Sequence, residues 1–362
     1  MGRKRVLDVL VSPTTRCNLR CRYCYVNQCQ NQAKADLSLD EIAVAYRWLD
    51  EFARLTGAER IRLTWFGGEP LYRGVAFLRE AVALQATLFS PSLEVVNTMQ
   101  SNLTLVNDDL IPLLKKSFHG SIGGSIDFQG VDRVFPNGEN SLAVAEKNVR
   151  RLRNAGICVG IVCTLTKSNS GDPEALYTYY KRLGTPFRVN RAAGTTDPKG
   201  LFLSIDEYNG IVKKLFDIYL SDPCPTVEFT NFAMMAKLYL AGLPVVCVDT
   251  LTPCLFLGIE AQGRIMSRCR FAGQLGNFMT DSPGAFYEKC QQQACGHPAP
   301  MKCRGCEFFN KVCLGGCPGE PDADCFNSHC GYRTETTYEL WRYVQDYLSR
   351  NGHTYAELRE FA

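Results

Sequence analysis

The chain has 362 residues, of which 46% are apolar and 21% charged, and its 40 basic residues nearly balance its 37 acidic ones. This length and apolar content are enough to bury a substantial core in one large domain or two smaller ones. Because the net charge is only +3, the composition gives no support for a nucleic-acid-binding protein or for attachment to an anionic membrane surface.

The amino-terminal stretch, "MGRKRVLDVLVSP", does not look like a targeting segment. Its apolar run is short and is broken by Asp8, and nothing later in the chain approaches the length of a membrane span. We therefore expect a cytoplasmic protein without a membrane partner. In a reducing cytosol, 18 cysteines indicate metal binding or catalysis more than disulfides.

The first half of the chain alternates short β-rich runs with amphipathic helical stretches. The predicted strands cover residues 5–12, 60–68, 93–102, 120–128, 157–165 and 186–194. The predicted helices cover residues 38–55, 75–89, 107–116, 141–156 and 172–184. This α/β alternation predicts a parallel sheet curled into a partial (β/α)6 TIM-like barrel, with its chemistry at the carboxyl ends of the strands.

Two local signals mark helix ends, and a change in composition marks a second domain. Ser38 and Glu41 form a capping-box pattern, and Gly156 is expected to stop the fourth helix. After about residue 225 the alternation stops, and from about residue 244 the chain is rich in Cys and Gly. We predict a barrel over 1–225, a helical bridge over 226–243, and a small Cys-rich domain over 244–362 that ends in a docking helix.

Cys17, Cys21 and Cys24 directly follow the first predicted strand, on a loop at the reactive edge of the sheet. Three thiolates can hold three irons of a 4Fe-4S cluster and leave the fourth iron open to a small molecule. The alternatives are a zinc knuckle with a distant fourth ligand, or thiols that are simply reactive.

This CxxxCxΦC spacing, in which Φ is the aromatic Tyr23, resembles the signature of the radical S-adenosylmethionine (SAM) superfamily. The resemblance implies that SAM occupies the open iron and is cleaved reductively to a 5'-deoxyadenosyl radical, which abstracts a hydrogen atom. By the same resemblance Tyr23 lies near the adenine.

The segment "WFGGEP" ends the second predicted strand, and its Gly67, Gly68 and Glu69 resemble the GGE motif of that superfamily. The resemblance implies that these residues receive the SAM ammonium group. This implied role agrees with simple chemistry, because a cation needs hydrogen-bond acceptors and glycine lets backbone carbonyls approach it closely.

Further positions resemble the superfamily more loosely. Asn102 in "QSNLTL" matches a TNG-like stretch, and the segment from Ser125 resembles sulfatase-maturating enzymes and related peptide modifiers. The resemblance implies that Ser125 and Asp127 face the SAM ribose or the substrate and that Arg133 binds a carboxylate. Polar residues at strand ends also serve turns and helix caps, which is the competing explanation.

The carboxyl-terminal cysteines form a second constellation that, taken alone, suggests a zinc ribbon or another iron-sulfur site. After the radical SAM loop, their spacing resembles a SPASM domain, which implies two auxiliary 4Fe-4S clusters. By that resemblance the first auxiliary cluster takes Cys247, Cys254, Cys269 and Cys317. The second takes Cys303, Cys306, Cys313 and Cys330, with Cys325 as the competitor for the last position.

One departure from the sulfatase-maturating pattern bears on chemistry. Where those enzymes carry an aspartate proposed as the catalytic base, directly after the third ligand of the first auxiliary cluster, this chain has Arg270. A guanidinium cannot accept a proton at neutral pH. The catalytic base is therefore unassigned, and formylglycine formation by that route is in doubt.

Six remaining cysteines have no assigned partner. Cys158 and Cys163 alternate with aliphatic residues in a predicted strand and are expected to be core residues. Cys290 and Cys295 are expected in a loop, and Cys29 and Cys224 carry no assigned role.

The leading functional hypothesis is a radical SAM peptide maturase that forms a cross-link or another oxidative modification in a ribosomally made peptide. The alternatives are an anaerobic sulfatase-maturating (formylglycine-forming) enzyme, a small-molecule alcohol dehydrogenase of the SPASM group, and, outside enzymes, a zinc-binding interaction module. The implied partners are a peptide or protein substrate and a reductant such as flavodoxin or ferredoxin. Because no winged-helix leader-binding block precedes the barrel, we expect any leader to be recognised by the barrel, by the SPASM domain or by a separate protein.

Overall fold

The computed structural model describes residues 5–24, 34–192, 197, 199–240, 256–267, 273–295 and 338–351. All six predicted strands are present, as β1 (Val6–Val11), β2 (Arg60–Trp65), β3 (Glu94–Ser101), β4 (Ser121–Ser125), β5 (Cys158–Leu165) and β6 (Phe187–Arg191). Between them lie α2 (Leu39–Thr56), η1 (Pro70–Arg73), α3 (Val75–Ala83), α4 (Gln85–Leu88), α5 (Leu110–Ser117), α6 (Leu142–Asn154) and α7 (Pro173–Leu183).

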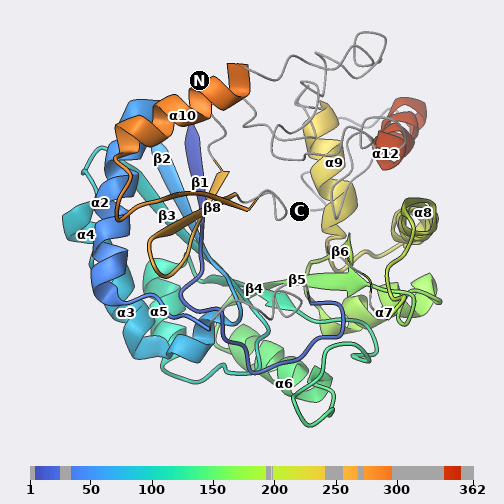
Figure 1. The fold of residues 1–362 in the computed structure, drawn as a ribbon. Helices are drawn as coiled ribbons and strands as arrows, with labels where there is room; N and C mark the ends of the chain where they lie inside the picture. Colours follow the sequence, from blue (N-terminus) through green and yellow to red (C-terminus); the bar gives the residue numbers. More distant parts are fainter. Residues whose placement is uncertain are drawn as a thin grey trace.

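The strands from β1 to β6 pair in parallel with their sequence neighbours. The sheet curves into an open arc, and the helices from α2 to α7 cover its outer side (Figure 1). The predicted parallel α/β architecture is therefore confirmed. At one seam, between β3 and β4, only Gln100 and Ser101 are in register with the next strand.

Strand alternation decides which side chains fill the core. In β1, Leu7, Val9 and Val11 are almost fully buried. The residues between them point to the opposite face, where Asp8 accepts hydrogen bonds from the guanidinium of Arg62 at 2.5 and 2.6 Å. The sheet therefore has an apolar helix-facing side and a partly polar inner side.

Both predicted helix signals are confirmed. The hydroxyl of Ser38 accepts a hydrogen bond from the backbone N–H of Glu41, and the carboxylate of Glu41 accepts one from the backbone N–H of Ser38. Gly156 follows the end of α6 with a φ of 77°, a conformation that favours glycine.

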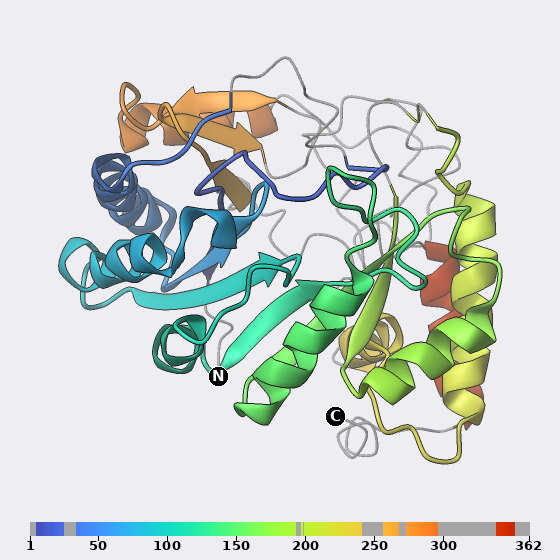
Figure 2. The ribbon, with the colours of Figure 1, turned by 90° about the horizontal axis from the view of Figure 1, so that it is seen from below.

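Three short strands extend the sheet beyond the six predicted ones. β7 (Phe256–Ile259) pairs in parallel with β1, and β8 (Arg264–Ser267) and β9 (Gln274–Asn277) follow in antiparallel order. Figure 2 shows them in orange at the β1 side of the sheet. They lie in the segment predicted to form a second domain, yet they are hydrogen-bonded into the first sheet. The division of the chain at residues 225 and 243 stays a prediction.

Four helices complete the described fold: α8 (Ile205–Ser221), α9 (Thr230–Leu240), α10 (Pro283–Cys295) and α12 (Tyr338–Asn351). α10 packs on α2, where the ring of Phe286 lies 5.2 Å from that of Trp48 and 5.6 Å from that of Phe52. The parts of the chain that the structure describes contain no helix with both the length and the apolarity to span a bilayer.

The predicted carboxyl-terminal docking helix is confirmed as α12, which packs on α8 and α9. Its buried residues are Leu340, Trp341, Val344 and Leu348. Their spacing places one apolar stripe along the helix.

Candidate functional site

The candidate site is built from the loops that follow β1, β2, β3 and β4. In parallel strands these loops meet at one edge of the sheet. The structure brings the predicted residues of that edge together, because Glu69 contacts Asn102, Asn102 contacts Cys17, and Arg133 contacts Cys21.

The loop that carries Cys17, Cys21 and Cys24 is held by its backbone on two sides. On one side, the N–H groups of Gly68 and Glu69 donate to the carbonyls of Thr14 and Arg16 at 3.0 and 2.9 Å. On the other side, the N–H groups of Arg20 and Arg22 donate to the carbonyls of Val134 and Asp132 at 2.7 and 2.8 Å. Neighbouring strand-end loops thus fix the three-cysteine loop in place.

Gly67 and Gly68 are required by the cysteine loop itself. A Cβ on Gly68 would lie 2.2 Å from the carbonyl oxygen of Arg16, and a Cβ on Gly67 would lie 2.7 Å from that of Thr14. Gly67 also has a φ of 120°, which side chains other than glycine rarely adopt. The motif therefore packs directly on the cysteine loop, and its contact with the SAM ammonium group stays a prediction.

The carboxylate of Glu69 is buried and ties β2 to the end of β3. It accepts hydrogen bonds from the N–H of Leu71 at 3.1 Å, the hydroxyl of Ser101 at 2.8 Å and the N–H of Asn102 at 2.7 Å. Burial raises the pKa of Glu69 to about 6, although these three donors oppose the shift. Ser101 was not anticipated, but its place next to Asn102 at a strand end was an available signal.

Asn102, the match to the TNG-like stretch, lies beside the first cysteine. Its side-chain amide donates to the side-chain oxygen Oδ1 of Asn18 at 2.9 Å and approaches the sulfur of Cys17 at 3.8 Å. The backbone N–H of Leu19 also points to that sulfur, at 3.4 Å. Cys17 therefore has two neutral hydrogen-bond donors directed at its sulfur.

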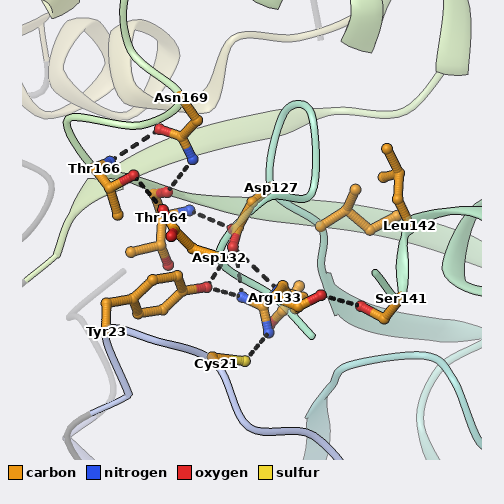
Figure 3. Close-up of polar contacts among 12 residues, drawn as sticks. Cys21, Tyr23, Asp127, Asp132, Arg133, Ser141, Leu142, Thr164, Thr166 and Asn169 are labelled. Carbon is orange, nitrogen blue, oxygen red and sulfur yellow. Dashed lines mark hydrogen bonds and ion pairs between the residues drawn. The ribbon is translucent and has the colours of Figure 1, made fainter. Parts of the chain in front are cut away.

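A second network surrounds Cys21 (Figure 3). The guanidinium of Arg133 donates to the carboxylate of Asp127 at 3.2 Å, to the hydroxyl of Tyr23 at 2.5 Å and to the sulfur of Cys21 at 3.7 Å. The hydroxyl of Tyr23 donates in turn to Asp127. Asp127 also accepts a bond from the backbone N–H of Thr164 at 2.9 Å, a partner from β5 that no motif indicated.

This network shows what the predicted residues contact within the chain. The carboxylate next to Arg133 is that of Asp127, whose two oxygens both accept hydrogen bonds from inside the protein. Ser125 lies apart and accepts from the side chain of Gln100 at 2.8 Å. Contacts of these residues and of Tyr23 with SAM or substrate stay predictions.

Asp132 is a further buried carboxylate that the sequence did not single out. One oxygen accepts from the hydroxyl of Thr166 at 2.7 Å. The other has no hydrogen-bond partner among the described residues and lies 3.9 Å from the guanidinium of Arg22. Because its backbone carbonyl accepts from the N–H of Arg22, Asp132 helps to anchor the cysteine loop.

The electrostatics at Cys17 and Cys21 disfavour the hypothesis of simply reactive thiols at these two positions. Burial raises the pKa of Cys21 to about 12, with Arg133 opposing the shift, and burial also raises the pKa of Cys17. Reactive cysteines have lowered pKa values, whereas buried thiols become thiolates when they bind a metal.

The donor set fits an iron-sulfur cluster. Three thiols lie on one fixed loop, and hydrogen-bond donors point at the sulfurs of Cys17 and Cys21. Within the described residues no three His, Cys, Asp or Glu side chains gather as they do around a single metal ion. Thiolates of a 4Fe-4S cluster bind different irons, so they need not converge on one point.

Two expectations about the other cysteines were wrong. Cys163 is buried, but Cys158 is exposed, because residues five apart in a strand point to opposite faces. Cys290 and Cys295 lie in helix α10 and not in a loop. Cys224 is exposed.

Several predicted residues lie outside the described residues. They are Cys29, Cys247, Cys254, Cys269, Arg270, Cys303, Cys306, Cys313, Cys317, Cys325 and Cys330. The two auxiliary clusters therefore stay a prediction.

Residues 11–178 match the family model of the radical SAM superfamily. The serine-type anaerobic sulfatase-maturating enzyme of Klebsiella aerogenes is 25% identical over 332 residues, which cover 87% of this chain and 80% of that protein. The cysteine-type anaerobic sulfatase-maturating enzyme of Clostridium perfringens (strain 13 / Type A) is 23% identical over 335 residues, covering 86% of this chain and 88% of that protein.

Solved structures share the fold at lower identity. Native anSMEcpe with bound AdoMet superposes with a TM-score of 0.74 at 19% identity, covering 95% of this chain and 97% of that one. Streptococcus suis SuiB bound to precursor peptide SuiA gives a TM-score of 0.59 at 16% identity, covering 87% of this chain and 72% of that one. The similarity in fold therefore extends well beyond residue 178.

Proposed function

We propose, from the match of residues 11–178 to the radical SAM model, that the chain is a radical SAM peptide maturase, which oxidatively cross-links or otherwise modifies a residue within a peptide. The observation that carries the proposal is the fixed loop of Cys17, Cys21 and Cys24. It is packed on Gly67 and Gly68, and hydrogen-bond donors point at the sulfurs of Cys17 and Cys21.

Cys17, Cys21 and Cys24 would hold a 4Fe-4S cluster, next to which SAM would bind. When bound, the cluster and SAM supply a 5'-deoxyadenosyl radical that removes a hydrogen atom from the substrate. Within the chain, Glu69 holds the ends of β2 and β3 together. The network of Tyr23, Asp127 and Arg133 holds the cysteine loop against the ends of β4 and β5.

Two further parts of the proposal rest on sequence resemblance. Eight carboxyl-terminal cysteines would hold two auxiliary 4Fe-4S clusters: Cys247, Cys254, Cys269, Cys303, Cys306, Cys313, Cys317 and Cys330. A flavodoxin or ferredoxin would deliver electrons, and a leader peptide would be recognised by this chain or by a separate protein.

A peptide substrate is supported by the comparisons. The relatives are named as sulfatase-maturating enzymes, and two structures of the same fold are described with a Cp18Cys peptide and with precursor peptide SuiA. These names favour sulfatase maturation as the second candidate. Arg270 in place of the expected aspartate favours the maturase.

The test incubates the reconstituted protein anaerobically with SAM, a reductant and one of two peptides. One peptide is encoded beside the gene, and the other carries a sulfatase-type Ser. The maturase proposal expects 5'-deoxyadenosine and the loss of two hydrogen atoms from the first peptide, with no reaction toward a hydrazine probe for aldehydes. A hydrazine-reactive product from the second peptide alone would establish sulfatase maturation instead.

A matched pair of cysteine variants serves as the control. Cys21→Ala removes a predicted ligand and should abolish 5'-deoxyadenosine formation. Cys163→Ala removes a buried thiol on β5 and should still form 5'-deoxyadenosine. SAM cleavage that survives in Cys21→Ala would contradict the assignment of the cluster loop.

A further inference from the structure

Among the described residues, Arg133 is the charged group whose hydrogen bond reaches a sulfur of the three-cysteine loop. Its Nη1 atom lies 3.7 Å from the Sγ of Cys21, whereas Cys17 receives a backbone N–H and the neutral amide of Asn102. A hydrogen bond from a cation to sulfur is stronger than one from a neutral group.

The guanidinium is fixed in this position. Its Nε and Nη2 atoms donate to the two oxygens of Asp127 at 3.2 and 3.4 Å, and Nη2 also donates to Tyr23. The backbone carbonyl of Arg133 accepts from both the N–H and the hydroxyl of Ser141, at 3.1 and 3.0 Å. With the side chain only 11% exposed, the positive charge is held at one distance from Cys21 and is little screened by water.

We propose that Arg133 is a positioning residue that donates a hydrogen bond to the thiolate of Cys21 and thereby raises the reduction potential of the 4Fe-4S cluster. On reduction the cluster gains one electron from the external reductant and so one negative charge. A fixed cationic donor stabilises that reduced form more than the oxidised one, since hydrogen bonds to sulfur and nearby charge set such potentials. The inference rests on the cluster of the proposed function but not on its substrate.

The test is an EPR-monitored redox titration of the reconstituted protein without SAM or peptide. In Arg133→Met, which keeps the apolar stem but removes charge and donors, the ratio of reduced to oxidised cluster at a fixed potential should fall about tenfold, equivalent to roughly 59 mV for one electron. Arg133→Lys keeps the charge and should recover part of this loss. A potential in Arg133→Met equal to that of the parent protein would overturn the inference.

Arg22→Met is the matched control. Arg22 lies next to Cys21 in the chain, but its guanidinium is directed at Asp132 and its side chain is 47% exposed. This variant loses the same charge without losing a bond to sulfur, and its potential should stay close to that of the parent. Equal shifts in Arg22→Met and Arg133→Met would overturn the inference, because net charge alone would then explain both.

A second measurement covers the case in which Arg133→Met does not retain the cluster. In the parent protein, exchange into D2O should shift an iron–thiolate stretching band in the resonance Raman spectrum, and this shift should be smaller in Arg133→Lys. Identical isotope shifts in the two proteins would contradict the proposed bond. A parent protein that holds a cluster but modifies no peptide would overturn only the proposed function, whereas one that never holds a 4Fe-4S cluster would overturn both.

Discussion

At the scale of single residues, Gly68 shows how tightly the site is built. Its α-carbon faces the backbone of Arg16 so closely that no side chain fits between them. The contact joins the loop after β2 to the loop that carries the cysteines. A packing defect here therefore acts on the position of all three thiols.

Gly68→Ala should disturb that contact. Because the new methyl group would lie 2.2 Å from the carbonyl oxygen of Arg16, we expect a loss of about 1–3 kcal/mol in the free energy of unfolding and poor incorporation of iron. Gly171→Ala is the control, since a Cβ there meets nothing within 4 Å. Iron content after reconstitution and denaturant unfolding report the outcome, and equal behaviour of the two variants would be inconsistent with the steric argument.

The buried carboxylate of Glu69 should make stability depend on pH. Its pKa in the folded protein is about 6, above the ordinary value of 4.5. The protonated form is therefore favoured by folding, so this contribution is complete below pH 4.5 and is lost as the pH rises through 6, by about 2 kcal/mol. Unfolding of the parent and of Glu69→Gln, measured between pH 4.5 and 7, should differ in slope. Parallel curves would contradict the raised pKa.

At this scale, the sequence could predict which residues belong to the site only where neighbours in the chain form a motif. The cysteine loop and Gly67 to Glu69 are contiguous, so their spacing carries the information. The bond from Arg133 to Cys21 joins residues 112 positions apart, and only folding brings them together. The exposure of Cys158 could have been predicted, because residues five apart in a strand point to opposite faces and Cys158 therefore faces away from Cys163.

At the scale of secondary structure, long alternating runs were predictable and short ones were not. β1 to β6 each follow a run with clear alternation or a clear apolar core. β7, β8 and β9 have four residues each, which is too few for periodicity to separate a strand from a turn. β7 is placed by its hydrogen bonds to β1, β8 by those to β7, and β9 by those to β8.

The docking of α12 on α8 should weaken in acid. The carboxylate of Glu339 accepts hydrogen bonds from Lys213 and Asn209, and Lys213, the larger influence, lowers the pKa of Glu339 below its ordinary value of 4.5. This stabilisation is present above pH 4.5 and is lost as the pH falls through the lowered pKa. Hydrogen exchange of residues 338–351 should show better protection in the parent than in Glu339→Gln at pH 7, and this difference should shrink as the pH is lowered below 4.5. A difference that stays constant as the pH falls would point to another partner.

At the scale of the whole molecule, segments from both ends of the sequence contribute to one sheet and its surrounding helices. α10 packs on α2, and α12 packs on α8. The sequence could predict the barrel and the closing helix, because each carries its own pattern. It could not predict that β7, β8 and β9 would join the barrel sheet, since that choice depends on an open edge of β1.

Iron analysis of the whole chain tests the division between the two groups of cysteines. The proposed function expects about twelve irons per chain, and a variant with Cys17, Cys21 and Cys24 all replaced by Ala should keep about eight of them. The remaining irons would belong to predicted ligands that lie more than 200 residues later in the sequence. A variant that loses all iron, or a parent protein with about four irons, would exclude two independent auxiliary clusters.

The pairing of β1 with β7 also has a consequence for biosynthesis. The ribosome makes β1 first, but the strand that covers its outer edge, Phe256–Ile259, emerges only after the rest of the barrel. Until then the nascent chain presents an uncovered strand edge, which is prone to pairing with other chains. Prematurely terminated chains that stop before Phe256 should therefore aggregate, even though they contain the complete three-cysteine loop.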